Sequence, residues 1–227
     1  MGNILRLTAI SIVPILIAVT FHEVAHGFAA YLLGDNTAKA RGRLTLNPLA
    51  HIDPIGTVLM PVALLLLTRG RFVFGYAKPV PINPYNFKKP RKGLALSAIA
   101  GPAMNLMLAI ICGVLFTWVL MPFSAEASPV LALKVLAPVG AMLRMGVSIN
   151  LLLAAFNLIP IPPLDGGRVL AGVLPQRQAY SLEKLERYGF LIVVILILTG
   201  LASYFINPVM SLLTAVVDVF TKGGFGL

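Results

Sequence analysis

Long apolar runs separated by short polar loops dominate the pattern of hydrophobic and polar positions along the chain. At about 1.5 Å per residue in a helix, several of these runs are long enough to cross a hydrocarbon core of about 30 Å. We expect Asn207-Pro208 to break the chain, because proline removes a donor from the helix and its ring crowds the preceding turn. The predicted spans cover residues 5–33, 93–121, 136–159 and 190–205, followed by a last short helix at 209–220.

One apolar stretch is too short for a full crossing. Residues 54–67 contain 14 residues, whereas a transmembrane helix needs about 20. Basic loops flank this stretch on both sides, and a full crossing would place one of them on the outer face. We therefore predict a short or re-entrant helix there.

Two segments are predicted to be extended. Residues 40–46, "ARGRLTL", alternate in polarity and contain β-formers, so they predict a short strand. The prolines of 71–84, "RFVFGYAKPVPINP", exclude a helix and favour an edge strand or a polyproline-like ribbon. The pattern thus predicts an all-α polytopic membrane protein with about five to six membrane helices and short extended ribbons, forming a single domain over 1–227.

Composition supports a membrane protein and excludes a nucleic-acid partner. Hydrophobic residues make up 58% of the chain and charged residues only 11%, with a mean hydropathy of +0.91. A soluble domain carries about 25% charged residues. The net charge of +10 is concentrated in loops beside membrane segments, as is typical of cytoplasmic loops facing anionic headgroups. We therefore predict that 35–53, 69–92 and 161–187 face the cytoplasm and that 122–134 lies outside.

The apolar run 19–33, "VTFHEVAHGFAAYLL", contains His22, Glu23 and His26 in the pattern H-E-x-x-H. Residues four apart lie on one face of a helix, so both imidazoles can bind one metal ion. Glu23 is adjacent and can act as general base on a metal-bound water. Zinc accepts two imidazoles and a carboxylate and leaves a fourth position for water. The alternative is a polar cluster that holds helices together.

Asp165 is the outstanding candidate for a third ligand. The metzincin pattern would require glycine at 29 and histidine at 32, where this chain has Ala29 and Leu32. Asp165 follows a membrane span in the sequence "NLIPIPPLDGG", in which prolines prevent a regular helix. We expect Gly166 and Gly167 to permit unusual backbone angles. The alternative is that Asp165 only caps the following helix.

The chain contains four motifs, which together span about two thirds of its length: "FHEVAH" (21–26), "GRLTLNPLAHIDPIGT" (42–57), "AGPAMN" (100–105) and "NLIPIPPLDGG" (157–167). In this order they resemble the site-2 protease family of zinc intramembrane proteases, in its small form without PDZ or CBS domains. The resemblance implies that His22, His26 and Asp165 bind one zinc ion per chain and that Glu23 is the base. It also places Asn157 near the zinc, where it could donate to the developing oxyanion.

Three further features keep two interpretations each. His51 either supports the active site or is only an interfacial side chain. Asn105 is either a polar helix contact or part of the cavity wall. The ribbon 71–82 either pairs with an unwound substrate by strand addition or faces the headgroups.

The sequence therefore predicts a zinc-dependent intramembrane endopeptidase that cleaves within or beside transmembrane helices. We expect it in a bacterial or archaeal cell membrane, with the active site toward the cytoplasmic half. Its expected partners are the lipid bilayer, single-span membrane-protein substrates and a regulatory membrane protein. The alternatives are an ion or proton transporter that uses the same polar residues as a relay, and an inactive protease-like chaperone. Cys112 is the only cysteine, which excludes an intrachain disulfide.

Overall fold

The computed structural model describes residues 2–67 and 75–223, and over these residues the chain forms helices and no β-strand. Four helical stretches in this part are long and apolar enough to cross a membrane: Ile10–Leu32, Pro90–Glu126, Pro129–Asn157 and Ala202–Thr221. The all-α polytopic fold is thereby confirmed. The count of five to six is reached only if the shorter apolar helices at Pro54–Leu67 and Gly189–Leu198 are included.

The described helices have the following bounds in chain order. The α-helices are α1 (Gly2–Leu32), α2 (Thr37–Ala40), α3 (Met60–Leu67), α4 (Pro90–Val114), α5 (Met121–Glu126), α6 (Pro129–Leu131), α7 (Ala137–Asn157), α8 (Asp165–Val173), α9 (Gln176–Glu183), α10 (Gly189–Leu198) and α11 (Ala202–Thr221). Shorter 3₁₀ or π turns are η1 (Pro48–His51), η2 (Pro54–Leu59), η3 (Pro84–Asn86), η4 (Leu115–Leu120), η5 (Ala132–Leu136) and η6 (Lys184–Tyr188).

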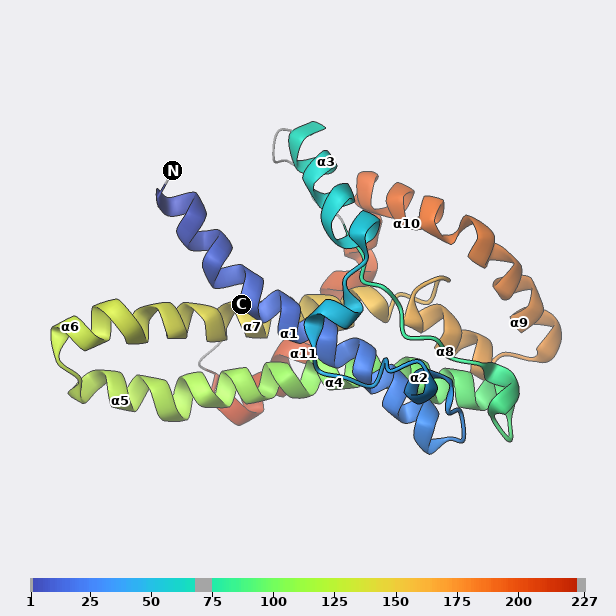
Figure 1. Cartoon of the computed structure of the whole chain (residues 1–227), viewed down its shortest axis with the longest axis horizontal. Helices are drawn as coiled ribbons and strands as arrows, with labels where there is room; N and C mark the ends of the chain where they lie inside the picture. Colours follow the sequence, from blue (N-terminus) through green and yellow to red (C-terminus); the bar gives the residue numbers. More distant parts are fainter. Residues whose placement is uncertain (1, 68–74, 224–227) are drawn as a thin grey trace.

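Helices α1, α4 and α7 pack against one another at the centre of the molecule, and α11 packs on α4 and α7 (Figure 1). Small side chains at helix contacts let main chains approach closely, as in other membrane bundles. Apolar side chains fill the seam between α4, α7 and α11. The buried cluster of that seam consists of Ala109, Val147, Leu151, Ala154, Ala155, Leu213 and Val217.

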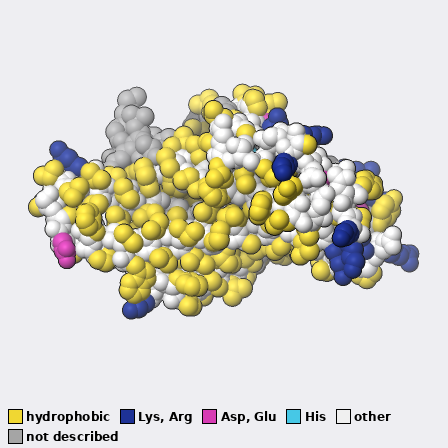
Figure 2. Space-filling view, turned by 60° about the horizontal axis from the view of Figure 1, so that its bottom comes forward, with side chains coloured by type: hydrophobic (Ala, Val, Ile, Leu, Met, Phe, Trp, Pro, Cys, Tyr) yellow, Lys and Arg dark blue, Asp and Glu magenta, His cyan; other side chains and the backbone are white. Residues whose placement is uncertain are grey.

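The outer surface is largely apolar, as expected for a chain surrounded by lipid. Figure 2 shows hydrophobic side chains over most of the face in view. Lysine and arginine gather toward the end of the molecule where α9 and the beginning of α4 lie (Figures 1 and 2). Four of these cations, Lys88, Lys89, Arg91 and Lys92, flank the first residue of α4.

The hairpin of residues 90–157 is longer than predicted. The expected loop at 122–134 is helical except for Ala127 and Ser128. The N–H of Met121 bonds the carbonyl of Phe116, five residues back, so a wide π turn carries the helix past Pro122. Ser128 then caps the returning helix by accepting from the N–H of Leu131.

The break predicted at Asn207-Pro208 is wrong. Pro208 lies inside α11, which runs without interruption from Ala202 to Thr221. The chain turns instead at Gly200, whose φ of +76° is a left-handed conformation that glycine adopts without strain. Because the turn comes early, α10 has only ten residues and does not form the span predicted for 190–205.

Residues 54–67 form η2 and α3, and α3 has no buried residue. Asp53 starts this segment, because its carboxylate accepts from the N–H groups of Ile55 and Gly56. In Figure 1, α3 projects away from the central helices. Its short length agrees with the prediction, and its re-entrant topology stays a prediction.

The strand predicted for 40–46 does not form. Gly42 has a φ of +63°, and the N–H of Arg43 bonds the carbonyl of Ala38, so the chain completes a turn at the end of α2. The predicted ribbon 71–84 lies partly outside the described residues. In its described part, 75–84, Pro84 begins the 3₁₀ turn η3. Residues 75–83, which we call the strap, are free of helix and reach back to the end of α1.

Candidate metal centre

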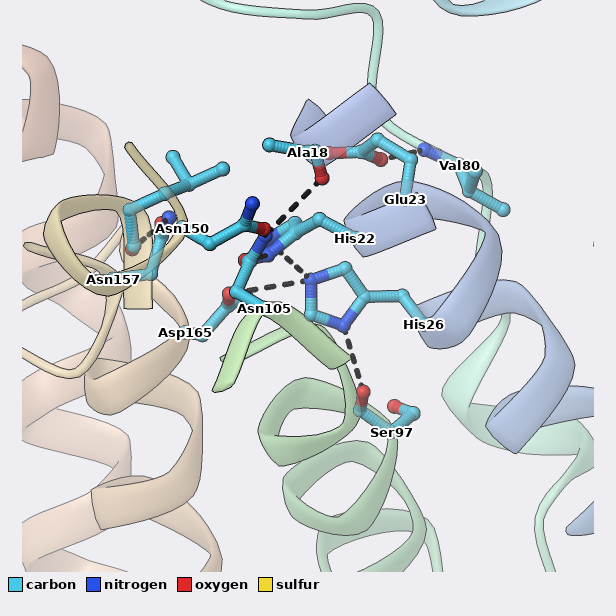
Figure 3. A network of polar contacts seen from close by, with 11 residues as sticks. Ala18, His22, Glu23, His26, Val80, Ser97, Asn105, Asn150, Asn157 and Asp165 are labelled. Atoms are coloured by element: carbon cyan, nitrogen blue, oxygen red, sulfur yellow. Dashed lines mark hydrogen bonds and ion pairs between the residues drawn. The ribbon is translucent and has the colours of Figure 1, made fainter. Parts of the chain in front are cut away.

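His22 and His26 lie one turn apart on α1 and point into the centre of the bundle (Figure 3). Their side chains are 7% and 8% exposed, so both imidazoles are buried. The two Nε2 atoms are 3.0 Å apart. The i, i+4 spacing of the motif therefore places both imidazoles at one point, as predicted.

Asp165 reaches the same point from the other end of the fold. It is the first residue of α8, after an irregular segment at 158–164. Its Oδ2 lies 3.2 Å from Nε2 of His22 and 3.2 Å from Nε2 of His26. It is 6% exposed, and it follows Leu164, the N-cap residue of α8.

The two glycines after Asp165 are required because they have no side chain, which allows close packing. The expectation that they adopt unusual backbone angles is wrong. Both lie in the first turn of α8, and neither has a positive φ. A Cβ on Gly166 would lie 2.3 Å from the carbonyl oxygen of Leu158, and one on Gly167 would lie 2.4 Å from the nitrogen of Pro162. The glycines thus let the irregular segment fold tightly against α8, which brings Asp165 to the histidines.

One face of α4 holds the outer side of both imidazoles. Nδ1 of His26 lies 2.7 Å from the carbonyl oxygen of Ser97, and Nδ1 of His22 bonds Oδ1 of Asn105. Gly101, between them, lies directly under the rings, because a Cβ there would be 2.4 Å from Nε2 of His26. Ser97, Gly101 and Asn105 are each four residues apart and therefore lie on one face of α4. Ser97 accepts a hydrogen bond from His26, Gly101 leaves space for the two rings, and Asn105 accepts a hydrogen bond from His22.

The hydrogen bonds of the Nδ1 atoms define the tautomers. A backbone carbonyl only accepts, so Nδ1 of His26 carries the proton, and the Nδ1 of His22 likewise donates to Asn105 Oδ1. In the neutral form of each imidazole, Nε2 then presents its lone pair toward Asp165 Oδ2. That oxygen is buried and has no hydrogen-bond partner among the described residues.

Three lone-pair atoms that face one another repel unless a cation lies between them. In a tetrahedral zinc site with bonds of about 2.0–2.1 Å, ligand atoms lie about 3.3 Å apart. The separations of 3.0, 3.2 and 3.2 Å are close to that edge length. His22, His26 and Asp165 also form a group of potential metal ligands within 4.8 Å of one another in the described part of the chain. The donor set and its spacing fit zinc.

Glu23 lies beside this centre and does not join it. Its Oε2 accepts a hydrogen bond of 2.8 Å from the main-chain N–H of Val80 in the strap (Figure 3). This bond leaves the second carboxylate oxygen available. Two main-chain hydrogen bonds hold the strap to the preceding loop region. The N–H of Tyr76 donates to the carbonyl of Gly56, and the N–H of Lys78 donates to the carbonyl of His51.

The end of the strap is fastened to the end of α1 by Asp35, which is fully buried. Its carboxylate accepts from the N–H of Asn83 at 2.7 Å and from Nδ2 of Asn86 at 2.7 Å. Burial raises the pKa of Asp35, and the hydrogen bonds from Thr37, Asn83 and Asn86 lower it by more, so the net pKa lies below the usual 3.8.

Two of the remaining sequence candidates, Asn157 and His51, hydrogen-bond main-chain carbonyls outside the three-residue centre. Asn157 is the last residue of α7, and its Nδ2 donates to the carbonyl of Leu153 at 2.9 Å. His51 is only 2% exposed, and its Nε2 lies 2.9 Å from the carbonyl oxygen of Thr45. His51 is therefore a buried residue of the 45–51 loop and not an interfacial side chain. Asn105, by contrast, contacts a predicted ligand directly.

Sequence reasoning missed three contributors: the carbonyl of Ser97, the N–H of Val80 and the side chain of Asn150. The first two are main-chain groups and leave no trace in residue type. For α4, the four-residue spacing of Ser97, Gly101 and Asn105 was a usable signal, because it matches the spacing of His22 and His26 on a facing helix.

The structure thus defines an integral membrane protein with a buried His-His-Asp centre and an adjacent glutamate. The sequence model of Peptidase family M50 matches residues 10–200, which is most of the chain. The chain belongs to peptidase family M50. This confirms the resemblance to site-2 proteases and the predicted class of enzyme, a metalloprotease.

Individual relatives agree. The chain is 40% identical over 200 residues to the Bacillus subtilis protein named "Putative zinc metalloprotease YwhC", covering 88% of this chain and 85% of that protein. It is 31% identical over 184 residues to a Mycolicibacterium smegmatis protein with the same description and the name Rip2, covering 81% of this chain and 64% of that longer protein. "Zinc metalloprotease MJ0392" of Methanocaldococcus jannaschii is 28% identical over 139 residues, which are 60% of this chain and 35% of that protein. No solved structure matches the chain.

Proposed function

We propose that the chain is a single-domain zinc endopeptidase that hydrolyses peptide bonds within or beside the transmembrane helices of single-span membrane proteins. The observation that carries this proposal is the convergence of three ligand atoms: Nε2 of His22 and of His26, on a helix long enough to span the membrane, and Oδ2 of Asp165 at the start of α8. His22, His26 and Asp165 would hold the zinc ion, which would supply Lewis-acid polarisation of the substrate carbonyl and activation of a water near neutral pH.

The protein residues supply proton transfer and orientation. Glu23 takes a proton from the attacking water through the carboxylate oxygen that Val80 leaves available, while the bond from Val80 to Oε2 fixes the carboxylate. Asn157, at the end of α7, is placed to donate to the developing oxyanion after its amide releases the carbonyl of Leu153.

The strap orients the base and is poorly suited to pair with a substrate strand. The N–H groups of Tyr76, Lys78 and Val80 all point into the protein. The residues between and after them include Pro79 and Pro81, which have no N–H. The outer edge of the strap therefore offers few donors for strand addition, and prolines are a common protection against it.

The active site belongs to the cytoplasmic half of the membrane in this proposal. The span of α1 runs from Ile10 to Leu32, and His26 lies six residues, or about 9 Å, from its second end. That end leads directly into Lys39, Arg41 and Arg43. Basic loops mark the cytoplasmic side, so the metal centre lies between the middle of the bilayer and that side.

Purified zinc-loaded protein in proteoliposomes tests the proposal, with a panel of single-span proteins as substrates and mass spectrometry of the products. We expect the wild type to cut within or beside the transmembrane segment. Glu23→Gln keeps the shape but removes the base, so we expect at most about one hundredth of the wild-type rate. Glu126→Gln, an exposed change at the end of α5, serves as the matched control and should cut normally.

The rival functions predict other results in the same vesicles. An ion or proton relay predicts flux without cleavage, and a chaperone predicts neither flux nor cleavage. Cleavage by Glu23→Gln at nearly the wild-type rate would refute the assignment of the base.

A further inference from the structure

Two asparagines are completely enclosed at the centre of the helix bundle. Asn105 on α4 is 0% exposed and Asn150 on α7 is 2% exposed, and both lie within predicted membrane spans. A buried amide inside a membrane is costly unless its donors and acceptors are satisfied. Their hydrogen bonds therefore indicate what the amides are for.

The amide of Asn105 has only one orientation that satisfies all its partners. Its Nδ2 donates to Oδ1 of Asn150 at 2.8 Å and to the carbonyl of Ala18 at 3.2 Å, which uses both N–H groups. The carbonyl oxygen Oδ1 is left to face Nδ1 of His22. A flipped amide would place its oxygen against two other oxygens.

The amide of Asn150, which lies farther from His22, is also held in one orientation by its hydrogen bonds. Its Nδ2 donates to the carbonyl of Gly146 on its own helix at 2.8 Å, so its Oδ1 faces Asn105. The result is a chain in which every hydrogen bond is donated in the same direction: Nδ1 of His22 donates to Asn105, Asn105 donates to Asn150, and Asn150 donates to the carbonyl of Gly146 on α7 (Figure 3).

We propose that Asn150 is a positioning residue for the metal centre: by fixing the orientation of the Asn105 amide, it keeps the proton of His22 on Nδ1 and the lone pair of Nε2 toward the metal. This inference rests on the proposed metal centre. Without Asn150, the Asn105 amide can rotate and present an N–H to Nδ1 of His22. The imidazole then takes the other tautomer, with its proton on the atom that should bind zinc.

Zinc affinity, measured by competition with a chelator in purified protein, tests this inference. Loss of an outer partner of a ligating histidine typically costs about 10- to 100-fold in metal affinity. We expect Asn105→Leu to fall in that range and Asn150→Leu to weaken zinc binding by about 10-fold. If Asn150→Leu does not fold, Asn150→Ala replaces it, because alanine adds no atoms.

A second background separates orientation from simple helix packing. Asn105→Asp presents a carboxylate oxygen to Nδ1 of His22 in either orientation of its side chain, and the Asn150 amide must turn so that its NH₂ faces the other oxygen. We expect Asn150→Leu to leave zinc affinity nearly unchanged when it is added to Asn105→Asp. The unfolding temperature of the metal-free proteins is measured in parallel, since a packing role lowers it without changing the zinc affinity of the folded protein.

The outcomes are distinct. Equal losses of zinc affinity from Asn150→Leu in both backgrounds, or no loss in the wild-type background, overturn the role of Asn150. If Asp165→Ala binds zinc as tightly as the wild type, the metal centre itself is wrong and this inference falls with it. A loss that disappears in the Asn105→Asp background supports the proposal.

Discussion

Substitution of Gly101 by alanine tests the packing of α4 against the metal centre. The new Cβ would lie 2.4 Å from Nε2 and 2.5 Å from Cε1 of His26, and 2.7 Å from Cε1 of His22. Ordinary contacts of a Cβ begin at 3.4 Å, so the rings or α4 must move by about 1 Å. Metal sites tolerate deviations of only about 0.2 Å in ligand distances.

The expected magnitudes follow from that displacement. Zinc affinity should fall by at least about 10-fold, because both imidazoles must shift away from Asp165. Overpacking costs about 1–3 kcal/mol, while replacing a helical glycine by alanine returns up to about 1 kcal/mol, so the net loss of stability should be modest. The variant should therefore fold and insert but bind zinc poorly.

The assay is zinc content and affinity of purified Gly101→Ala, together with its thermal unfolding. Gly140→Ala on α7 is the matched control, because its Cβ would contact the flexible Leu120 at 3.0 Å and is not near the histidines. It should retain zinc. Wild-type zinc affinity in Gly101→Ala would refute the close packing of α4 on the imidazoles.

Three further predictions follow from other parts of the fold. Asp165→Ala should lose zinc, whereas Asp53→Ala should keep it and only loosen the start of η2; metal analysis showing the reverse order would move the third ligand to the 51–57 loop. Since folding lowers the pKa of Asp35, its stabilising effect is complete above the unfolded pKa near 3.8 and is lost as the pH falls through the lower folded pKa. The stability gap between wild type and Asp35→Asn should thus be constant at and above about pH 5 and shrink as the pH falls from there through the folded pKa of Asp35; a gap that stays constant throughout thermal unfolding at these pH values contradicts this. Single cysteines at positions 40 and 90, in a chain without Cys112, should both react from the cytoplasmic side of intact cells; reaction from opposite sides excludes a re-entrant 54–67.

Local sequence patterns predicted the helices and the candidate ligands well. The spacing of His22 and His26 needs only helical periodicity, and the proline-rich context of Asp165 correctly indicated an irregular segment before it. The pairing of these distant segments was predicted in two steps: the irregular context of Asp165 made it the outstanding third ligand, and the family resemblance then implied the same ligand set.

Features that depend on how helices cross were not predictable in this way. Asn105 and Asn150 are 45 residues apart, and their hydrogen bond exists only because α4 and α7 cross at that point. Gly200 and Pro208 were misjudged for a different reason. Both residues disfavour a helix, and the local sequence does not indicate which of the two ends the helix that begins at Gly189.

X-ray absorption spectroscopy of the purified, zinc-loaded protein tests the central claim most directly. The account predicts one zinc per chain, bound by two imidazole nitrogens and oxygen ligands, with no sulfur. It also predicts that the spectrum is retained in Glu23→Gln and that zinc is lost from His22→Ala, His26→Ala and Asp165→Ala. A sulfur ligand, or an unchanged spectrum in Asp165→Ala, would contradict the proposed metal centre.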